Sequence, residues 1–256
     1  MLETKAISIG YGICDVVRDV SLTVRTGEIA VILGANGAGK TTLLRALNGA
    51  LPLLKGEILL DRKNLEKYSR SEIARKIAVV AQENELKFPV SVLEFVVGGR
   101  FASGHTFGWE TNQDLALARR AMEECDLVGF EKRMINQLSG GERQRAVFAR
   151  ALATQAKIFL LDEPTANLDL KHQTLLLRMM RQKCDEHQKT AVIITHDLNL
   201  AAQFADKIIL LKNGRAVAQG APEQVLTETY LQAAFEIEVI LDFHPTNEKL
   251  RVTTVY

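Results

Sequence analysis

A glycine-rich stretch that ends in lysine and threonine has the clearest chemical capability in the sequence. Residues 34–41 read Gly-Ala-Asn-Gly-Ala-Gly-Lys-Thr and match the pattern G-x-x-x-x-G-K-[ST]. Glycine lets the backbone approach phosphate oxygens closely, and the amides at a helix start attract anions. The Lys40 ammonium would add charge beside the β- and γ-phosphates, and the Thr41 hydroxyl could ligate Mg²⁺. The motif predicts a nucleoside triphosphate site rather than a merely structural turn.

Two adjacent carboxylates follow a short apolar run later in the chain. Asp162 and Glu163 come directly after Ile-Phe-Leu-Leu at 158–161. This order places both acids at the carboxyl edge of a sheet, where α/β proteins form ligand crevices. We expect Asp162 to hold Mg²⁺ or its water, and Glu163 to orient or deprotonate the attacking water. Two solvated loop acids fit less well, because the strand is buried and Pro164 fixes its exit.

His196 stands one residue beyond another apolar run, 191–194. From that position it could hydrogen-bond a γ-phosphate or the attacking water. A structural role fits this histidine equally well. The other four histidines have no such setting, and we expect surface or packing roles for them: His105, His172, His187 and His244.

A second glycine turn, Ser139-Gly140-Gly141, precedes a good helical pattern. It exposes the amides of a helix N-terminus and so provides a second potential anion site. Lys40 already serves the single γ-phosphate of one nucleotide, so a second phosphate-seeking helix suggests that two chains share each ATP. An ordinary glycine-rich helix entry is the alternative, and this turn alone would be weak support.

Buried strands and short helices must position these residues. Four apolar runs read as strands covered on both faces, the pattern of a parallel sheet between helices. They are residues 29–33, 158–161, 191–194 and 208–211, with 77–80 as a fifth and shorter strand. Helical patterns cover residues 40–48, 115–125 and 142–153. Asn213-Gly214 predicts a tight hairpin. The region from 84 to 156 is rich in helix and poor in strand, which indicates an inserted helical subdomain.

Composition bounds the class of protein. The 256 residues are 47% hydrophobic and 25% charged, as in ordinary globular enzymes. A net charge of +1 does not favour a nucleic acid as partner. The three cysteines lie far apart and fit reduced thiols in the cytosol. We find neither a signal-peptide pattern nor an apolar run of about 18 residues, so we expect another chain to supply any membrane pore.

Taken together, these motifs resemble the ATPase subunit of an ABC transporter, in the family's order and over nearly the whole chain. The resemblance implies an α/β P-loop NTPase fold with a mainly parallel core sheet, an N-terminal antiparallel β part and an inserted helical subdomain. It places the nucleotide-binding core at 1–83 and 157–256 and the helical signature subdomain at 84–156. ATP and Mg²⁺ are the implied cofactors.

The resemblance also assigns roles residue by residue. Tyr11 matches the aromatic that stacks on adenine, and Gln82 matches the glutamine that links Mg²⁺ to the membrane partner. Residues 138–142 match the signature motif, and residues 166–169, which end in Asp169, match the D-loop. The implied catalytic residues are Glu163, His196 and Lys40. The implied metal ligands are Thr41, Gln82 and Asp162. The implied nucleotide-binding residues are Tyr11, Gly34, Ala35, Asn36, Gly37, Ala38, Gly39, Lys40, Thr41, Thr42, Gln82, Ser139, Gly140, Gly141 and Asp169.

Within the family, three stretches resemble importers of ferric siderophores, haem and cobalamin. They are residues 168–173, 196–206 and 220–226. One departure follows Arg100, where Phe101-Ala-Ser-Gly-His105 replaces the proline and aromatic that are frequent in such subunits. That segment belongs to the groove expected to contact the permease, so the sequence does not identify the transported molecule. An importer for zinc, manganese or molybdate is the alternative.

The resemblance implies an assembly as well as an activity. Two copies are expected to sandwich two ATP molecules and to sit on membrane-spanning permease subunits, at the cytoplasmic side of the inner membrane. A secreted substrate-binding protein is an indirect partner. A soluble ABC ATPase of DNA or ribosomes fits less well, because the chain has one cassette and no room for a long coiled coil between Lys40 and Asp162. An inactive structural partner conflicts with the intact Lys40, Asp162, Glu163 and His196.

Overall fold

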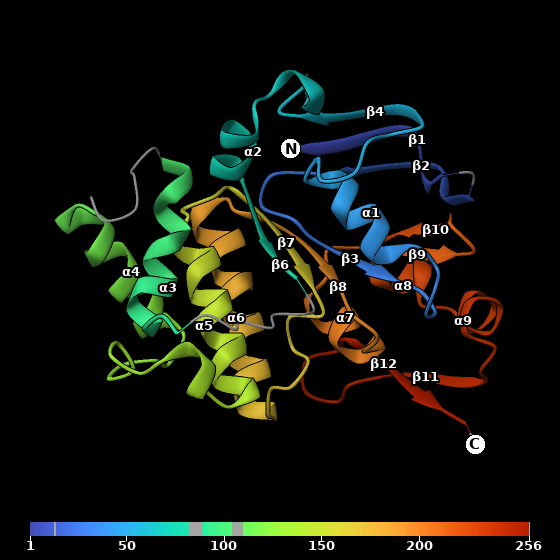
Figure 1. The fold of residues 1–256 in the computed structure, drawn as a ribbon. Helices are drawn as coiled ribbons and strands as arrows, with labels where there is room; N and C mark the ends of the chain where they lie inside the picture. The colour runs from blue at the N-terminus through green and yellow to red at the C-terminus, as the bar shows by residue number, and fades with distance from the viewer. Residues whose placement is uncertain (13, 82–88, 104–109, 256) are drawn as a thin grey trace. The chain divides into compact units, whose positions relative to one another are not determined.

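The protein is described here by a computed structural model that covers residues 1–12, 14–81, 89–103 and 110–255 (Figure 1). Contacts group the chain into two compact units, Met1–Tyr68 with Thr190–Tyr256 and Ser69–Lys189. The boundaries expected from the sequence, 83/84 and 156/157, stay a prediction.

The first unit begins with an antiparallel sheet. Its strands are β1 (Leu2–Tyr11), β2 (Cys14–Val24), β4 (Lys55–Leu60) and β5 (Lys63–Asn64), in the order β2-β1-β4-β5. A short 3-10 helix, η1 (Leu65–Lys67), follows β5. The hairpin of β1 and β2 runs from the pair Leu2 and Val24 to the pair Tyr11 and Cys14. This is the antiparallel β part that the family resemblance implies.

Parallel strands form the centre of the first unit. β3 (Ile29–Leu33) lies between β8 (Thr190–Ile194) and β9 (Lys207–Lys212) and is parallel to both. Every residue of β3 and β8 is buried, as expected for strands covered on both faces. β10 (Arg215–Gly220) returns antiparallel to β9. Asn213 and Gly214 both have positive φ, 49° and 78°, so the hairpin predicted from this dipeptide is confirmed.

Helices and a terminal hairpin complete this unit. The helices are α1 (Lys40–Leu47), α7 (Leu198–Phe204), α8 (Pro222–Val225) and α9 (Glu228–Phe235), and the hairpin is β11 (Val239–Phe243) with β12 (Leu250–Thr254). α7 packs against β12, where the Asn199 side chain bonds both backbone groups of Val252. Gly49 has a φ of 72°, the left-handed conformation expected just after the end of α1.

The second unit combines two parallel strands with helices. β6 (Ile77–Val80) pairs with β7 (Ile158–Asp162). The helical elements are α2 (Arg70–Lys76), α3 (Val92–Val97), η2 (Gly98–Ser103), α4 (Asn112–Glu124), η3 (Ile135–Gln137), α5 (Gly140–Ala153) and α6 (Leu170–His187). α3, α4 and α5 pack on one another. Between 89 and 156, the regular elements of the described residues are helical, in keeping with the predicted helical subdomain.

Capping boxes set where the helices of this unit begin. Thr111 accepts a hydrogen bond from the Asp114 amide, and Asp114 accepts one from the Thr111 amide, so α4 starts at Asn112. The sequence pattern placed this start at 115. Ser139 and Glu142 cap α5 in the same way, so the helix includes both glycines and starts two residues before the predicted 142. Apolar periodicity misses such first turns because their residues are polar or glycine.

A buried ion pair joins three elements of the helical part. The Arg100 guanidinium donates to Asp114 at 2.8 Å, to the Ala153 carbonyl at 3.0 Å and to the Thr154 carbonyl at 3.2 Å. The side chains of Arg100 and Asp114 are only 13% and 2% exposed. The guanidinium thus links η2, the first turn of α4 and the end of α5.

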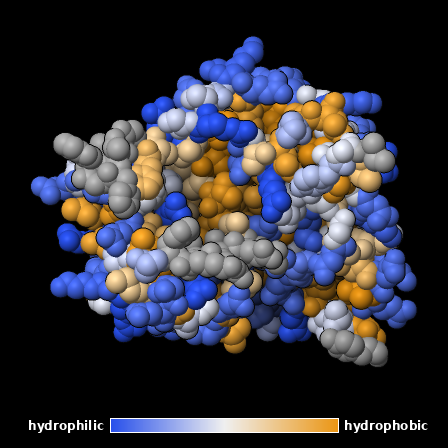
Figure 2. Space-filling view, viewed as in Figure 1, coloured by the Kyte–Doolittle hydropathy of each residue, from blue (hydrophilic) through white to orange (hydrophobic). Residues whose placement is uncertain are grey.

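Among the described residues, no helix combines the length and the apolar character needed to cross a bilayer. On the face shown in Figure 2, hydrophilic residues are interspersed with hydrophobic ones.

Candidate nucleotide site

The glycine loop connects β3 to α1 and has a backbone that few side chains would tolerate. Gly34, Gly37 and Gly39 have positive φ values of 154°, 79° and 97°. At Gly34 a β-carbon would lie 2.4 Å from the Leu211 carbonyl oxygen, whereas at Gly37 it would meet no atom within 4 Å. The loop is therefore packed on β9 at its start and open at its middle, as a cradle for phosphate requires.

Lys40 lies over this loop. Its ammonium donates to the Gly34 carbonyl at 2.8 Å and to the Ala35 carbonyl at 3.0 Å, and the residue is buried. The positive charge thus sits on the inner side of the glycine turn, beside the N-terminus of α1. Amides, ammonium and the adjacent Thr41 hydroxyl together fit a polyphosphate with its magnesium ion.

The hairpin between β9 and β10 holds the loop from the other side. The Gly214 amide donates to the Ala38 carbonyl at 3.2 Å, and the Gly214 carbonyl accepts from the Arg18 amide at 2.7 Å. Beside these residues lies a cavity of about 210 Å³, lined by both loop and hairpin residues such as Asn36 and Asn213. The sequence marked Gly214 as a turn residue but did not indicate that it supports the phosphate loop.

Gly34→Ala is expected to lower the free energy of unfolding by about 3 kcal/mol, because the new methyl group would collide with the Leu211 carbonyl and φ would be strained. The matched control is Gly12→Ala, at a positive φ of 60° but with no atom within 4 Å of a β-carbon. That change should cost only about 1 kcal/mol. Urea denaturation of both variants measures the difference, and equal midpoints would contradict the packing described for Gly34.

The acid pair stands at the carboxyl end of β7, as predicted. Asp162 is the last residue of this fully buried strand, and Glu163 follows it with a positive φ of 48°. Such a conformation costs a non-glycine residue of the order of 1 kcal/mol and fixes the direction of its side chain. The Gln144 amide of α5 donates to the next carbonyl, that of Pro164, at 3.1 Å. Sequence reasoning missed this support.

The turn Ser139-Gly140-Gly141, called the signature turn below, begins α5, and the Ser139 hydroxyl caps this helix. Ser139 Oγ accepts from the Glu142 amide at 3.3 Å, and the Glu142 carboxylate accepts from the Ser139 amide at 2.8 Å. The hydrogen bond from the Ser139 amide, helped by the Ser139 hydroxyl and by Arg133 and Arg145, lowers the pKa of Glu142. The hydroxyl has a single proton, which serves the Glu142 carboxylate here, so donation to an anion in front of the helix requires the hydroxyl to rotate.

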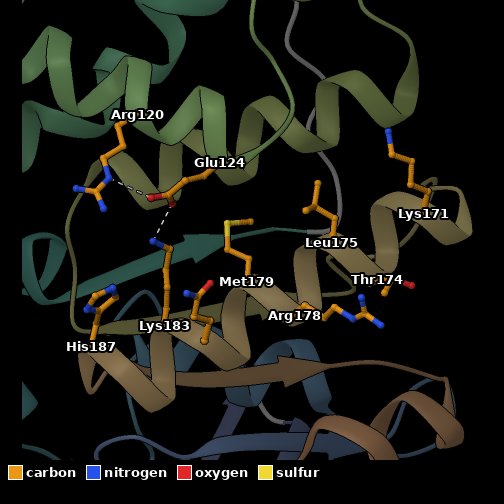
Figure 3. A pocket seen from close by; sticks show the side chains of 10 residues that line it. Arg120, Glu124, Lys171, Thr174, Leu175, Arg178, Met179, Lys183 and His187 are labelled. Carbon is orange, nitrogen blue, oxygen red and sulfur yellow. Dashed lines mark hydrogen bonds and ion pairs between the residues drawn. The ribbon is translucent and has the colours of Figure 1, made fainter.

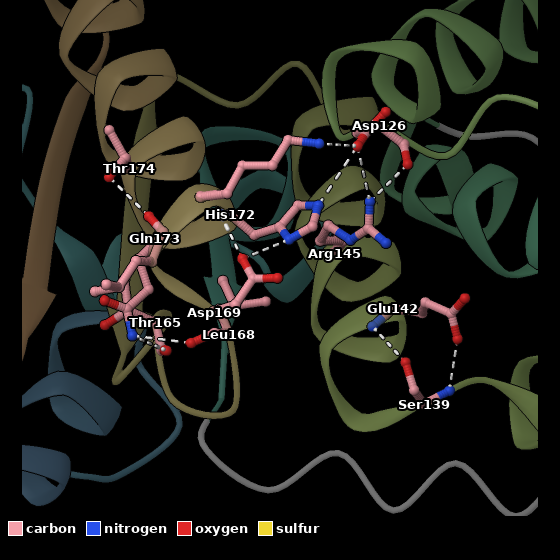
Figure 4. Close-up of polar contacts among 12 residues, drawn as sticks. Asp126, Ser139, Glu142, Arg145, Thr165, Leu168, Asp169, His172, Gln173 and Thr174 are labelled. Carbon is pink, nitrogen blue, oxygen red and sulfur yellow. Dashed lines mark hydrogen bonds and ion pairs between the residues drawn. The ribbon is translucent and has the colours of Figure 1, made fainter.

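The segment after Glu163 lies against this turn (Figure 4). A β-carbon at Gly141 would lie 3.2 Å from the Asn167 carbonyl oxygen, and one at Gly140 would lie 3.7 Å from Asn167 Cβ. Gln173 of α6 fixes the segment by donating to the Leu168 carbonyl at 3.0 Å. Asp169 then caps α6 by accepting from the His172 amide at 2.9 Å. The structure thus brings the expected D-loop and signature residues together.

The remaining expected residues lie at strand ends. β3 and β8 are parallel, with Ile32 opposite Ile194, so the exposed His196 lies at the same sheet edge as the glycine loop. Tyr11 ends β1 and is 48% exposed, which leaves its ring accessible for stacking. Thr42 is buried in α1. Gln82, expected to bind nucleotide and metal, lies outside the described residues.

A larger cavity, about 650 Å³, lies between α4 and α6 (Figure 3). Its wall carries basic side chains, but Glu124 pairs with two of them, Arg120 at 3.3 Å and Lys183 at 2.7 Å. None of its lining residues is a glycine. It therefore lacks the backbone cradle of a phosphate site, and the smaller opening at the glycine loop is the better candidate.

Comparison with known proteins identifies the class that this fold and site define. Residues 17–166 match the family model described as ABC transporter. The chain therefore belongs to the ABC transporter family.

Several of its relatives are named as import ATP-binding proteins. The chain is 40% identical to the hemin import ATP-binding protein of Rhodococcus jostii, over 95% of this chain and 82% of that protein. It is 39% identical to the cobalamin import ATP-binding protein of Halobacterium salinarum, over 92% of this chain but 58% of that protein. It is also 39% identical to an ABC transporter ATP-binding protein of Bacillus subtilis, over 97% of this chain and 56% of that protein. The chain thus spans little more than half the length of these two relatives.

Solved structures confirm the expected fold. A metal-chelate type ABC transporter in an inward-facing conformation matches with a TM-score of 0.86 and 29% identity, over 100% of this chain and 97% of that one. A dimeric bacterial ABC transporter cassette matches with a TM-score of 0.78 and 29% identity, over 87% of this chain and 99% of that one. The α/β cassette fold implied by the sequence motifs is thereby confirmed.

Proposed function

We propose that the chain is the ATP-binding and ATP-hydrolysing subunit of an importer for a ferric siderophore, haem or cobalamin. The observation that carries this proposal is the glycine loop with Lys40 on its inner side, in a chain whose relatives are named for hemin and cobalamin import. Two copies, attached to permease subunits at the cytoplasmic face of the membrane, would alternate between closed and open arrangements. A secreted binding protein would deliver the cargo.

Each ATP is proposed to lie between two chains. The γ-phosphate would contact Lys40 of one copy and the Ser139 hydroxyl and Gly141 amide of the other. Thr41, Gln82 and Asp162 would hold Mg²⁺, which when bound neutralises charge on the β- and γ-phosphates. Glu163 would accept the proton of the attacking water, and His196 would hydrogen-bond the γ-phosphate. After hydrolysis the two copies would separate, and Gln82 would transmit this movement to the permease.

Mixing two inactive variants tests this arrangement. Lys40→Ala removes the ammonium of one half-site, and Gly141→Asp places a negative charge where the other half-site meets phosphate. A mixed dimer then contains one intact site and one doubly impaired site. At equal concentrations, half of the dimers are mixed, so the mixture should regain up to about a quarter of wild-type ATPase activity.

A second mixture is the matched control. Lys40→Ala and Glu163→Gln would impair the same half-site, so their mixed dimer has one lesion in each site and should stay inactive. Recovery in this mixture, or none in the first although sizing shows mixed dimers, would refute the shared site. The cargo is tested separately, by asking whether loss of the protein abolishes growth on haem or siderophore iron or on limiting cobalamin.

A further inference from the structure

His172 lies between two carboxylates in the second unit (Figure 4). Its Nδ1 is 2.7 Å from Asp169 Oδ1, and its Nε2 is 3.4 Å from Asp126 Oδ2. The imidazole is only 17% exposed. The ring therefore bridges the N-terminal cap of α6 and Asp126, which lies two residues beyond the end of α4.

Asp126 also contacts α5, the helix that begins at the signature turn and is called the signature helix below. Arg145 of α5 donates to the Asp126 carbonyl at 2.6 Å, and its guanidinium lies 3.5 Å from the Asp126 carboxylate. Lys171 of α6 also contacts this carboxylate, at 3.3 Å. The hydrogen bond from Lys171, followed by that from His172, lowers the pKa of Asp126. Asp126 is thus an anion that joins α6 to α5.

Asp169 is an anion as well. The hydrogen bond from the His172 amide is the main reason that the pKa of Asp169 is lowered, and Lys171 adds to it. An ionised carboxylate only accepts hydrogen bonds, and a neutral imidazole donates only one. The His172 ring thus contacts two anionic carboxylates, one through each of its nitrogens.

We propose that His172 is a positioning residue, which ties the D-loop to the signature helix through Asp126 and Arg145. This inference rests on the proposed function, in which Asp169 and Ser139 both serve ATP hydrolysis between two chains. The D-loop already lies on Gly141 through the Asn167 carbonyl, and the His172 bridge fixes its far end. Loss of the imidazole removes both contacts and releases the D-loop from α5.

Two substitutions at this position test whether the bridge needs donors toward both carboxylates. His172→Gln presents donors from a single nitrogen, so it should lower kcat about threefold to tenfold while KM for ATP changes less than about twofold. His172→Arg offers several nitrogen donors that can reach both carboxylates, so it should restore much of kcat. His187→Gln, at an exposed histidine on the same helix, is the matched control and should behave as wild type.

Asp126→Asn tests whether His172 is linked to Arg145 through the Asp126 carboxylate. It should lower kcat as His172→Gln does, and the double variant should be no worse than either single variant, because one link is broken in both. Additive losses, or a His172→Arg chain whose kcat is as low as that of His172→Gln, would overturn the proposal.

Hydrogen exchange keeps this inference distinguishable from the proposed function. Amides of residues 163–169 should exchange faster in His172→Gln and Asp126→Asn than in wild type or His187→Gln, whether or not the chain hydrolyses ATP. Exchange identical to wild type would overturn the bridge. A wild-type chain without ATPase activity would refute the proposed function, while the exchange data would still decide whether the bridge exists.

Discussion

Replacing Glu163 by glutamine is expected to lower the steady-state rate of ATP hydrolysis by about 10²–10⁴-fold, since a positioned general base contributes this much. The two side chains have nearly the same shape, but the amide of glutamine cannot accept the proton of the attacking water. Because Lys40 and the glycine loop are untouched, ATP affinity should stay close to wild type. The variant should accumulate as an ATP-bound dimer, which size-exclusion chromatography with and without ATP detects.

The control for this substitution is Glu186→Gln. Glu186 is exposed on α6 and accepts a hydrogen bond from Gln182 at 3.0 Å, so the same chemical change there should leave hydrolysis unaffected. A Glu163→Gln chain that turns over ATP at the wild-type rate would show that another group activates the water.

Arg100→Ala is expected to lower the free energy of unfolding by about 3–5 kcal/mol, since it leaves the buried carboxylate of Asp114 without its cation. Two backbone carbonyls, those of Ala153 and Thr154, also lose a donor. Removing both charges together, in Arg100→Ala with Asp114→Ala, should cost less than the sum of the single substitutions. Chemical denaturation of the three variants gives the comparison.

An exposed ion pair supplies the contrast. Arg120 and Glu124 lie one helical turn apart on α4 at 3.3 Å, with the arginine side chain 72% exposed. Arg120→Ala should cost at most about 1 kcal/mol, because solvent screens the pair. If both arginine variants unfolded at the same denaturant concentration, burial would not be what makes the Arg100 pair important.

The parts of the fold that could be predicted are those with a strong local pattern. The buried runs that became β3, β7, β8 and β9 each lie within one or two residues of expectation, because continuous apolar strands have few alternatives. The long strands β1 and β2 were not located by pattern. They carry charged residues on exposed positions and change register several times, which disturbs the alternation of apolar and polar residues.

The residues of the candidate site also fall into two groups, those that the sequence could predict and those that it could not. The glycine loop, the acids after β7 and the turn at Ser139 were identifiable because their residue types and spacing are chemically demanding. The supports of these motifs were not. Gly214 contacts Ala38, Gln144 contacts Pro164 and Asp126 contacts His172 through pairings remote in sequence, and nothing local distinguishes such a residue from a surface one. His172 was expected to have only a packing or surface role.

The approach of Asn167 to Gly141 has a consequence for how this sequence can evolve. At 3.2 Å from the Asn167 carbonyl oxygen, a methyl group at position 141 would make an unusually tight contact, and the neighbouring segment would have to shift by a few tenths of an ångström. The two motifs are therefore coupled, and a substitution at 141 is better tolerated together with a change at 167 or 168. In a mutational library selected for transport, variants at these positions should be recovered as pairs, and single changes at Gly141 should be depleted.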